Sequence, residues 1–276
     1  MTPIKLMLNG LPGNVAMIIA GHAAKDEQFE LLPWSLTGPE IEQNEVLVEG
    51  TPVALVRPDA RNTVIQTIME ANDRFISVDY THPGAVNDNV RFYCDNHLPF
   101  VMGTTGGDRE ALVDTVAASH ISAVIAPNMA KQIVGFQAMI AYAAENFPGL
   151  FTGYEMTVRE SHQQGKADTS GTAKAVVRHF NQLGVDITEA DIIKERNPAI
   201  QKTELGIPEE HLVGHAWHTY TLLSPDRSAK FEFTHNINGR DIYADGTLDA
   251  VRYLLDKINQ GVTGKVFSMI DVLRQA

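Results

Sequence analysis

Residues 160–173 form a short segment that brings together groups able to hold and protonate a small acid. Ser170–Thr172 stand where a helical pattern begins, and a helix N-terminus offers free backbone N–H groups and the positive end of the helix dipole to an anion. Lys166 adds a full positive charge, and the imidazole of His162 can donate a proton near neutral pH. The segment therefore predicts a pocket for a small carboxylate whose reaction needs a proton. In the alternative interpretation, Ser170 is a helix N-cap, and His162 and Lys166 lie in a solvated loop.

A glycine-rich loop follows the first strand-like segment and opens a helical one, which is the context of a dinucleotide-binding turn. The loop reads Asn-Gly-Leu-Pro-Gly-Asn-Val-Ala over residues 9–16. Glycines there allow a tight turn and a close approach of the backbone to a pyrophosphate at the helix N-terminus. We expect Gly10, Gly13, Asn14 and Val15 to face a dinucleotide. The alternative is a glycine-rich βα turn without a ligand.

The end of the second predicted strand bears on which nicotinamide cofactor would bind. A carboxylate at that position binds the ribose diol of NAD, but residues 32–37 read Leu-Pro-Trp-Ser-Leu-Thr, and Glu30 lies inside the strand. The hydroxyls of Ser35 and Thr37 could accept the 2′-phosphate of NADP. The sequence therefore favours NADPH and leaves NADH as the alternative.

Further turns follow predicted strands and would lie at the same edge of a parallel sheet. Gly-Thr-Thr-Gly at 103–106 offers backbone N–H groups and hydroxyls that suit a nicotinamide carboxamide, and Pro-Asn-Met at 127–129 precedes a long helix. Either could instead be an ordinary turn that ends in a helix N-cap. A third turn, Thr-His-Pro at 81–83, follows the predicted strand Phe75–Tyr80. The expected cofactor contacts at the three turns are Thr81, Gly103, Thr104, Thr105, Pro127, Asn128 and Met129.

Strands alternate with helices over the first half of the chain, which predicts a parallel, doubly wound sheet of the Rossmann type. Each expected helix has apolar residues at helical spacing. The expected strands are Ile4–Asn9, Phe29–Leu32, Pro52–Val56, Phe75–Tyr80, Pro99–Met102 and Ala123–Ala126. The expected helices are Asn14–Ala24, Ala60–Glu70, Val86–Asn96 and Asp108–His120.

The second half changes to strands with period-2 alternation, which predicts an α+β domain for substrate binding and oligomerisation. The expected strands are Tyr154–Glu160, Ala216–Leu223 and Lys230–Asn236, with helices Ala130–Phe147 and Thr172–Leu183. Tyr243–Gln260 is a closing helix, and residues 197–210 read as an exposed loop. We expect residues 1–129 with 241–276 to form the dinucleotide-binding domain and 130–240 the second domain. An open sheet there predicts a homodimer or homotetramer.

The chain of 276 residues is acidic and poor in cysteine, with a formal net charge of −12. This charge argues against a broad basic surface for nucleic acid or an anionic membrane. No apolar stretch approaches the roughly 20 residues of a membrane span. The single cysteine, Cys94, reads as a small buried residue and allows no internal disulfide. A reducing compartment is expected: the cytoplasm, or the plastid stroma if a transit peptide has been removed.

The remaining histidines do not predict a metal site. His215 and His218 are three residues apart in a predicted strand and should point to opposite faces of the sheet. The sequence also has no Gly-x-Ser-x-Gly elbow and no Walker loop.

Taken together, the motifs resemble those of the hydroxy-tetrahydrodipicolinate reductases, also called dihydrodipicolinate reductases, of lysine and diaminopimelate biosynthesis. The likeness keeps its order over nearly the whole chain, from the glycine loop through Asp79–Pro83, 103–106, 126–129 and 160–172 to Gly246. It is closest to the plant-type branch, because His162 is followed by Gln163 rather than by a second histidine. It implies reduction of a cyclic imine dicarboxylate by hydride from a reduced nicotinamide.

The resemblance also implies roles for matching residues. His162 would donate the proton, and Lys166 would hold and polarise the substrate. Further substrate contacts implied are Ser170, Gly171, Thr172 and Arg240. Gly10, Gly13, Gly103, Thr105, Asn128 and Met129 would face the cofactor. Two alternatives stay open from the residues: another NAD(P)-dependent dehydrogenase of a small carboxylate, and an NAD(P) sensor without turnover.

Overall fold

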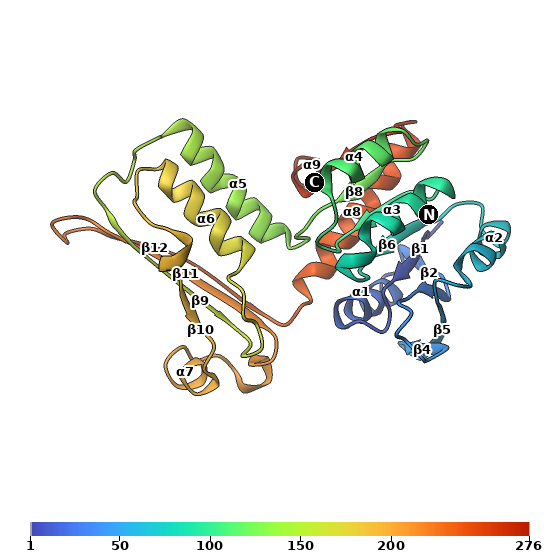
Figure 1. The fold of residues 1–276 in the computed structure, drawn as a ribbon, viewed down its shortest axis with the longest axis horizontal. Helices are drawn as coiled ribbons and strands as arrows, with labels where there is room; N and C mark the ends of the chain where they lie inside the picture. Colours follow the sequence, from blue (N-terminus) through green and yellow to red (C-terminus); the bar gives the residue numbers. More distant parts are fainter. Residues whose placement is uncertain (1, 276) are drawn as a thin grey trace. The chain divides into compact units, whose positions relative to one another are not determined.

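The computed structural model describes residues 2–275, which divide into two compact units. Unit 1 comprises the chain up to Lys131 together with the return of the chain from Asp241, and unit 2 is the continuous stretch Gln132–Arg240. Figure 1 follows the chain through both units. Within the described residues, no helix is both long and apolar enough to cross a membrane.

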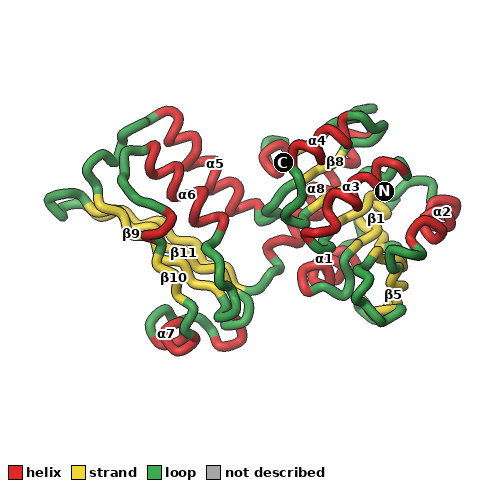
Figure 2. The backbone as a smooth tube through the Cα atoms, in the orientation of Figure 1, coloured by secondary structure: helices red, strands yellow, loops and turns green. Residues whose placement is uncertain are grey.

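Unit 1 is built on a parallel sheet of six strands in the order β13-β8-β7-β6-β1-β2, and all of its pairings are parallel. This order confirms the predicted doubly wound Rossmann-type fold. Figure 2 shows the strands in yellow within their cover of helices. The strands are β1 (Ile4–Asn9), β2 (Phe29–Leu31), β6 (Ile76–Asp79), β7 (Phe100–Met102), β8 (Ala123–Ile125) and β13 (Val266–Phe267).

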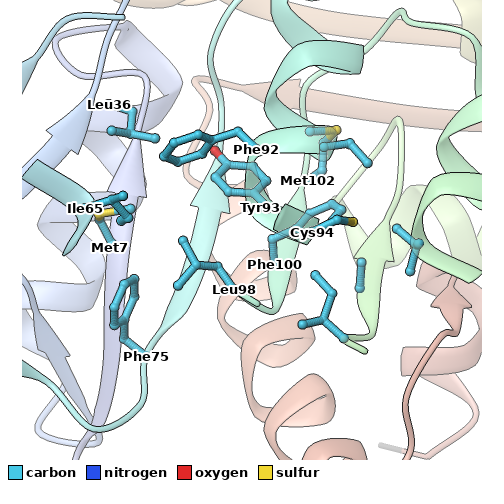
Figure 3. Close-up of a cluster of buried hydrophobic side chains, with 14 of the residues drawn as sticks. Met7, Leu36, Ile65, Phe75, Phe92, Tyr93, Cys94, Leu98, Phe100 and Met102 are labelled. Atoms are coloured by element: carbon cyan, nitrogen blue, oxygen red, sulfur yellow. The ribbon is translucent and has the colours of Figure 1, made fainter. Parts of the chain in front are cut away.

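Helices cover both faces of this sheet, because both sets of alternating strand residues are buried. Met7, Phe100 and Met102 belong to a core with the neighbouring helices α3 and α4, part of which Figure 3 shows. Leu6 and Val101, which point the other way, are also fully buried. The helices of unit 1 are α1 (Asn14–Lys25), α2 (Arg61–Ala71), η1 (Pro83–Ala85), α3 (Val86–Asp95), α4 (Arg109–Ala117), α8 (Ile242–Asn259) and α9 (Met269–Leu273). Cys94 is buried in α3, as expected.

One predicted strand of unit 1 pairs outside the main sheet. β5 (Thr51–Val56) forms a separate three-stranded sheet with β3 (Trp34–Leu36) and β4 (Glu45–Val48), neither of which the sequence pattern indicated. The turn Glu49-Gly50 has positive φ at both residues, the geometry that joins two adjacent antiparallel strands. This local hairpin, and not the parallel sheet, sets the place of β5.

Unit 2 is a four-stranded sheet in the order β10-β9-β11-β12 with two long helices on one face. Val158 of β9 and Tyr220 of β11 pack there against Ile140 of α5 and Phe180 of α6. The opposite face presents polar side chains such as Thr157, Thr219, Thr221, Thr234 and Asn236. The elements are α5 (Lys131–Asn146), β9 (Glu155–His162), α6 (Gly171–Gln182), η2 (Glu189–Asp191), β10 (Ile193–Glu195), α7 (Pro198–Thr203), η3 (Glu209–His211), β11 (His215–Leu223) and β12 (Lys230–Asn238).

The predicted exposed loop at 197–210 is wrong in part, because it contains helix α7 and a fully buried side chain. Asn197 caps the helix by accepting from the Ala199 N–H, and Pro198 occupies the first turn. Gln201 is 0% exposed and donates from its amide to the carbonyls of His162 and Glu195. The segment is therefore held against the end of β9, next to the candidate site.

Candidate active site

A cavity of about 650 Å³ in unit 1 opens at the carboxyl ends of β1 and β6. Gly10, Gly13, Thr37 and Thr81, four of the expected cofactor contacts, line it. Parallel α/β sheets bind their ligands at this edge. The structure thus brings these four residues together where a dinucleotide would bind.

The backbone of the glycine loop fits a close approach by a ligand. Gly10 has a φ of +103°, and its N–H donates to the Leu36 carbonyl at 2.8 Å. A Cβ at Gly10 would overlap the Tyr80 carbonyl, so only glycine is accommodated. The Gly13 N–H turns back to the Gly10 carbonyl, and helix α1 begins at Asn14, followed by Val15. The loop is therefore a cradle at a helix N-terminus, as a pyrophosphate requires.

Ser35 and Thr37 fix the glycine loop through hydrogen bonds to the backbone of Leu11. Ser35 is 0% exposed, and its hydroxyl accepts from the Leu11 N–H at 3.2 Å. The Thr37 hydroxyl donates to the Leu11 carbonyl at 2.7 Å while the residue lines the cavity. Ser35 thus acts on the loop conformation, whereas Thr37 is placed to meet a ligand as well.

A buried carboxylate that the motifs did not single out organises two of the expected turns. Asp79 ends β6 at 0% exposure, and its Oδ1 accepts from the N–H and hydroxyl of Thr81 and, at 2.6 Å, from the hydroxyl of Thr104. Its Oδ2 accepts from Tyr93 and from the amide of Asn89. Burial raises the pKa of the Tyr93 phenol, which keeps that donor protonated. Thr81 and Thr104 are thereby tied to one carboxylate.

The other expected cofactor residues lie at the ends of β7 and β8, beyond the lining of the cavity. Gly103 follows β7 and packs against the Tyr80 ring, while Thr105 is exposed. Pro127 is exposed, Asn128 uses its side-chain oxygen to cap the Ala130 N–H, and Met129 is 2% exposed. These turns share the sheet edge with the glycine loop, because β8, β7, β6 and β1 are neighbours in one parallel sheet.

The candidate substrate site lies in unit 2, where β9 ends and α6 begins. His162 is the last residue of β9 and is 7% exposed, and Ser170 is the N-cap of α6. The Ser170 N–H donates to Glu160 Oε2 at 3.0 Å and is therefore not available to a ligand. Within residues 2–275, the N–H groups of Gly171 and Thr172 have no acceptor, and the space at Gly171 is open. They form the free anion-binding end of the helix.

Lys166 and Arg240 complete the set of expected substrate residues. The Lys166 ammonium lies 2.7 Å from Asp168 Oδ1, which lowers the pKa of that carboxyl. Its side chain is 22% exposed, so it lies at the edge of the site rather than free in solvent. The Arg240 guanidinium lies beside Gly214, which precedes β11.

Arg196, which the sequence did not single out, fastens the loop between His162 and Ser170. It pairs with Glu160, which is 0% exposed, through Nη2 and Oε1 at 2.6 Å. It also donates to the carbonyls of Lys166, at 2.7 Å, and Asp168, at 3.3 Å. One guanidinium thus fixes both the strand and the loop that carry the candidate site. Bidentate and fork-like donation of this kind is specific to arginine.

His162 belongs to a group of aromatic and imidazole side chains on the helix-covered face of the sheet, all buried except the half-buried His235. Its Nε2 lies 3.0 Å from Nε2 of His218, and Nδ1 of His218 lies 3.2 Å from Nε2 of His235. The Tyr220 hydroxyl is 3.2 Å from His218 Nδ1. As predicted, His215 points to the other face, where it bonds to Ser161. The strand register brings His218 to His162 from 56 positions away, and no local motif carries that information.

The surroundings of His162 favour its neutral form. Burial, and then the positive charges of Arg196 and Lys166 and the neighbouring His215, lower its pKa from 6.5 to about 4, against a smaller opposite effect of the His215 backbone. Burial likewise lowers the pKa of His218 and brings that of His235 to about 4. The ring therefore carries a second proton near neutral pH only if a bound anion stabilises its imidazolium form.

Glu160, His162 and His218 each place a potential ligand atom within 4.8 Å of the others. Carboxylate and imidazole are ligands for divalent metals such as Zn²⁺. Arg196 and the Ser170 N–H, however, already engage both carboxylate oxygens of Glu160. The three residues are thus accounted for as a hydrogen-bonded polar core.

Comparisons with known proteins agree with these features. The family models "Dihydrodipicolinate reductase, N-terminus" and "Dihydrodipicolinate reductase, C-terminus" match residues 4–129 and 133–273. The chain is 44% identical over 272 residues to the chloroplastic 4-hydroxy-tetrahydrodipicolinate reductase 1 of Arabidopsis thaliana, covering 99% of this chain and 78% of the relative. It is 45% identical to reductase 2 of that plant, with the same coverage.

A solved structure supports the fold. The dipicolinate-bound dihydrodipicolinate reductase of Paenisporosarcina sp. TG-14 superposes with a TM-score of 0.64 at 16% identity, covering 97% of this chain and 98% of that chain. Two family models that together span nearly all of the described residues, and plant relatives above 40% identity, leave one assignment: this chain belongs to the dihydrodipicolinate reductase family, in its plant-type branch.

Proposed function

We propose that this chain is a 4-hydroxy-tetrahydrodipicolinate reductase of lysine biosynthesis. It would reduce a cyclic dicarboxylate containing a conjugated C=N bond to the tetrahydro product, with hydride from NAD(P)H. The family supplies the reaction class. The single observation that supports it in the structure is the convergence at the end of β9: a buried imidazole, an ammonium and the free N–H groups of α6.

The parts of the site suit a dicarboxylate. The N–H groups of Gly171 and Thr172, with the Thr172 hydroxyl, would bind one carboxylate, and Lys166 would hold the substrate electrostatically. Arg240 is a candidate for a second contact on the same unit. Because Arg196 fixes the loop, these donors are held ready before the ligand arrives.

The cofactor cradle fits a dinucleotide, since Gly10 leaves no room for a Cβ and the helix N-terminus follows at once. When bound there, NAD(P)H would supply the hydride for the conjugated carbon. Gly10, Gly13, Asn14 and Val15 would hold the pyrophosphate, and Thr37, Thr81 and the turns after β7 and β8 the remainder. We propose NADPH as the better cofactor, because residues 32–37, which follow β2, include no carboxylate to bind a ribose diol.

His162 would supply the proton that balances the hydride. In the ligand-free protein its pKa is held at about 4. Two substrate carboxylates beside the ring would favour the imidazolium and raise that pKa. The site would then bind substrate together with a proton, transfer the proton to the enamine that hydride addition produces, and recover it from solvent.

Two further proposals concern the surroundings of the enzyme. The plant relatives are named as chloroplastic, so the plastid stroma is the compartment that we propose. The polar, helix-free face of the unit 2 sheet would pair between subunits, which gives a homodimer or homotetramer.

The test is oxidation of NADPH and of NADH with substrate made in situ from pyruvate and aspartate semialdehyde. The variant His162→Gln should lower kcat by about 10²–10⁴-fold with cofactor affinity unchanged. His211→Gln, an imidazole in η3 with no described side-chain contact to the site, is the control and should match the parent protein. Cofactor binding without oxidation of either nucleotide would favour a sensor or another substrate instead.

A further inference from the structure

Hydrogen bonds from neighbouring side chains can determine which ring nitrogen of His162 carries the proton. Three imidazoles, His162, His218 and His235, are joined in a row with Tyr220 beside them. Burial lowers the pKa of all three rings and raises that of the tyrosine. Near neutral pH each ring therefore carries one N–H and one lone pair, and the tyrosine keeps its proton.

Only two arrangements of protons satisfy the contact between His162 Nε2 and His218 Nε2. In the first, His218 donates from Nε2, and the His162 proton resides on Nδ1. In the second, His162 donates from Nε2, and His218 must carry its own proton on Nδ1. The choice depends on what His218 Nδ1 meets at its other side, which is the Tyr220 hydroxyl and His235 Nε2.

His235, at the far end of the row, distinguishes the two arrangements. In the second arrangement, His218 donates from Nδ1, so His235 Nε2, which lies opposite, must present a lone pair. The one proton of the neutral His235 ring must then lie on His235 Nδ1. That atom is buried and has no partner among the described residues. A buried N–H without an acceptor is rarer than a buried lone pair without a donor. In the first arrangement, Tyr220 donates to His218 Nδ1 and accepts from His235 Nε2, at 3.4 Å, and His235 Nδ1 is only a lone pair.

We propose that His218 is a positioning residue that holds His162 with its proton on Nδ1. Tyr220 directs His218 by donating to its Nδ1. The catalytic consequence rests on the proposed function: the proton offered to the substrate is the one on Nδ1, since Nε2 of His162 faces the protein interior. Without His218 the ring could rotate or hold its proton on either nitrogen, and only part of the molecules would present the donor.

The tautomer can be measured without turnover. ¹⁵N shifts and two-bond couplings of histidine-labelled protein at pH 7.5 separate the two forms, and the spectrum of His162→Gln identifies the His162 signals. The expected result is an Nδ1–H ring in the parent protein, a mixture in His218→Leu, and recovery of Nδ1–H in His218→Gln, whose amide can donate in place of Nε2. His120→Gln changes an exposed imidazole of unit 1 and should leave the signals unmoved.

Kinetics supply the second readout. His218→Leu should lower kcat by about 10–10²-fold, within the effect of a general acid, with KM changed less than about threefold, and His218→Gln should regain most of it. Tyr220→Phe keeps the packing and should give a milder loss, so it serves if His218→Leu fails to fold. An Nε2–H ring in the parent protein, or an unchanged ring and kcat in His218→Leu, would overturn the proposal. Full turnover by His162→Gln with the expected spectra would instead refute the proton-donor role and leave the positioning role intact.

Discussion

Replacement of Arg196 by methionine tests how far the candidate site depends on one buried ion pair. The guanidinium side chain is 17% exposed and its partner Glu160 is 0% exposed. The substitution leaves the Glu160 carboxylate inside unit 2 with the Ser170 N–H as its remaining donor. It also frees the Lys166 and Asp168 carbonyls from their shared partner.

The expected loss of stability follows from that arrangement. Removing one partner of a buried ion pair typically costs about 3–5 kcal/mol, because the other charge remains uncompensated. A domain has only about 5–15 kcal/mol of stability in total, so unit 2 should become marginal. Arg196→Met with Glu160→Gln removes both charges, and the double variant should be more stable than Arg196→Met alone.

Each unit contains one of the two tryptophans, which makes the assay specific. With Trp34→Phe as the background, Trp217 of β11 reports urea unfolding of unit 2 alone. Arg178→Met is the matched control: its ion pair with Glu189 is on the surface, with the arginine side chain 68% exposed, and should contribute less than about 1 kcal/mol. Arg196→Met within 1 kcal/mol of the control, or a double variant no more stable than the single one, would refute the reasoning.

Four further outcomes are expected. Unfolding free energy should fall by roughly 2 kcal/mol between pH 7.5 and 5 from His162 alone, because the unfolded chain binds its proton below pH 6.5 and the folded chain only near 4; His162→Gln should flatten that slope in urea titrations. Dipicolinate binding near pH 7 should take up about one proton per site, seen by calorimetry in two buffers, and none in His162→Gln. Gly10→Ala should lower the thermal midpoint and weaken NADPH binding, since its Cβ overlaps the Tyr80 carbonyl; equal nucleotide affinity would contradict the cradle. Ser35→Ala leaves the Leu11 N–H without its acceptor and should cost about 1–3 kcal/mol by denaturation, whereas Ser228→Ala in an exposed turn should cost little.

Local patterns predicted the elements that carry strong periodicity and clear ends. β1 is predicted at both ends because an apolar run stops at a glycine, and α1 begins where predicted, at Asn14. β13 was not predicted, because a strand of two residues has no periodicity to detect. Helix α7 carried a readable signal, an Asn-Pro start, but its short length and polar residues suggested a loop.

The candidate site likewise contains residues that local sequence predicted and residues that only the tertiary structure brings in. His162, Lys166 and Ser170–Thr172 stand in one continuous segment, so their types and spacing could be read directly. Arg196 reaches Glu160 from 36 positions away, and His218 reaches His162 through the pairing of β9 with β11. Strand register decides such contacts, and a single sequence does not specify register between distant strands.

The return of the chain to unit 1 at Asp241 has a consequence for biosynthesis. The sheet of unit 1 gains β13 beside β8 only after the last residues have been made, and α8, which contacts β6, β7 and β8, also arrives late. Unit 2 is one uninterrupted stretch and can complete its core during synthesis. At that point the first part of unit 1 has been made but still lacks residues 241–276. Unit 1 is thus the first unit to begin synthesis but can be completed only after unit 2 has been made. A chain cut short after unit 2 would expose the unpaired edge of β8 and the sheet face meant for α8, and would be prone to aggregate.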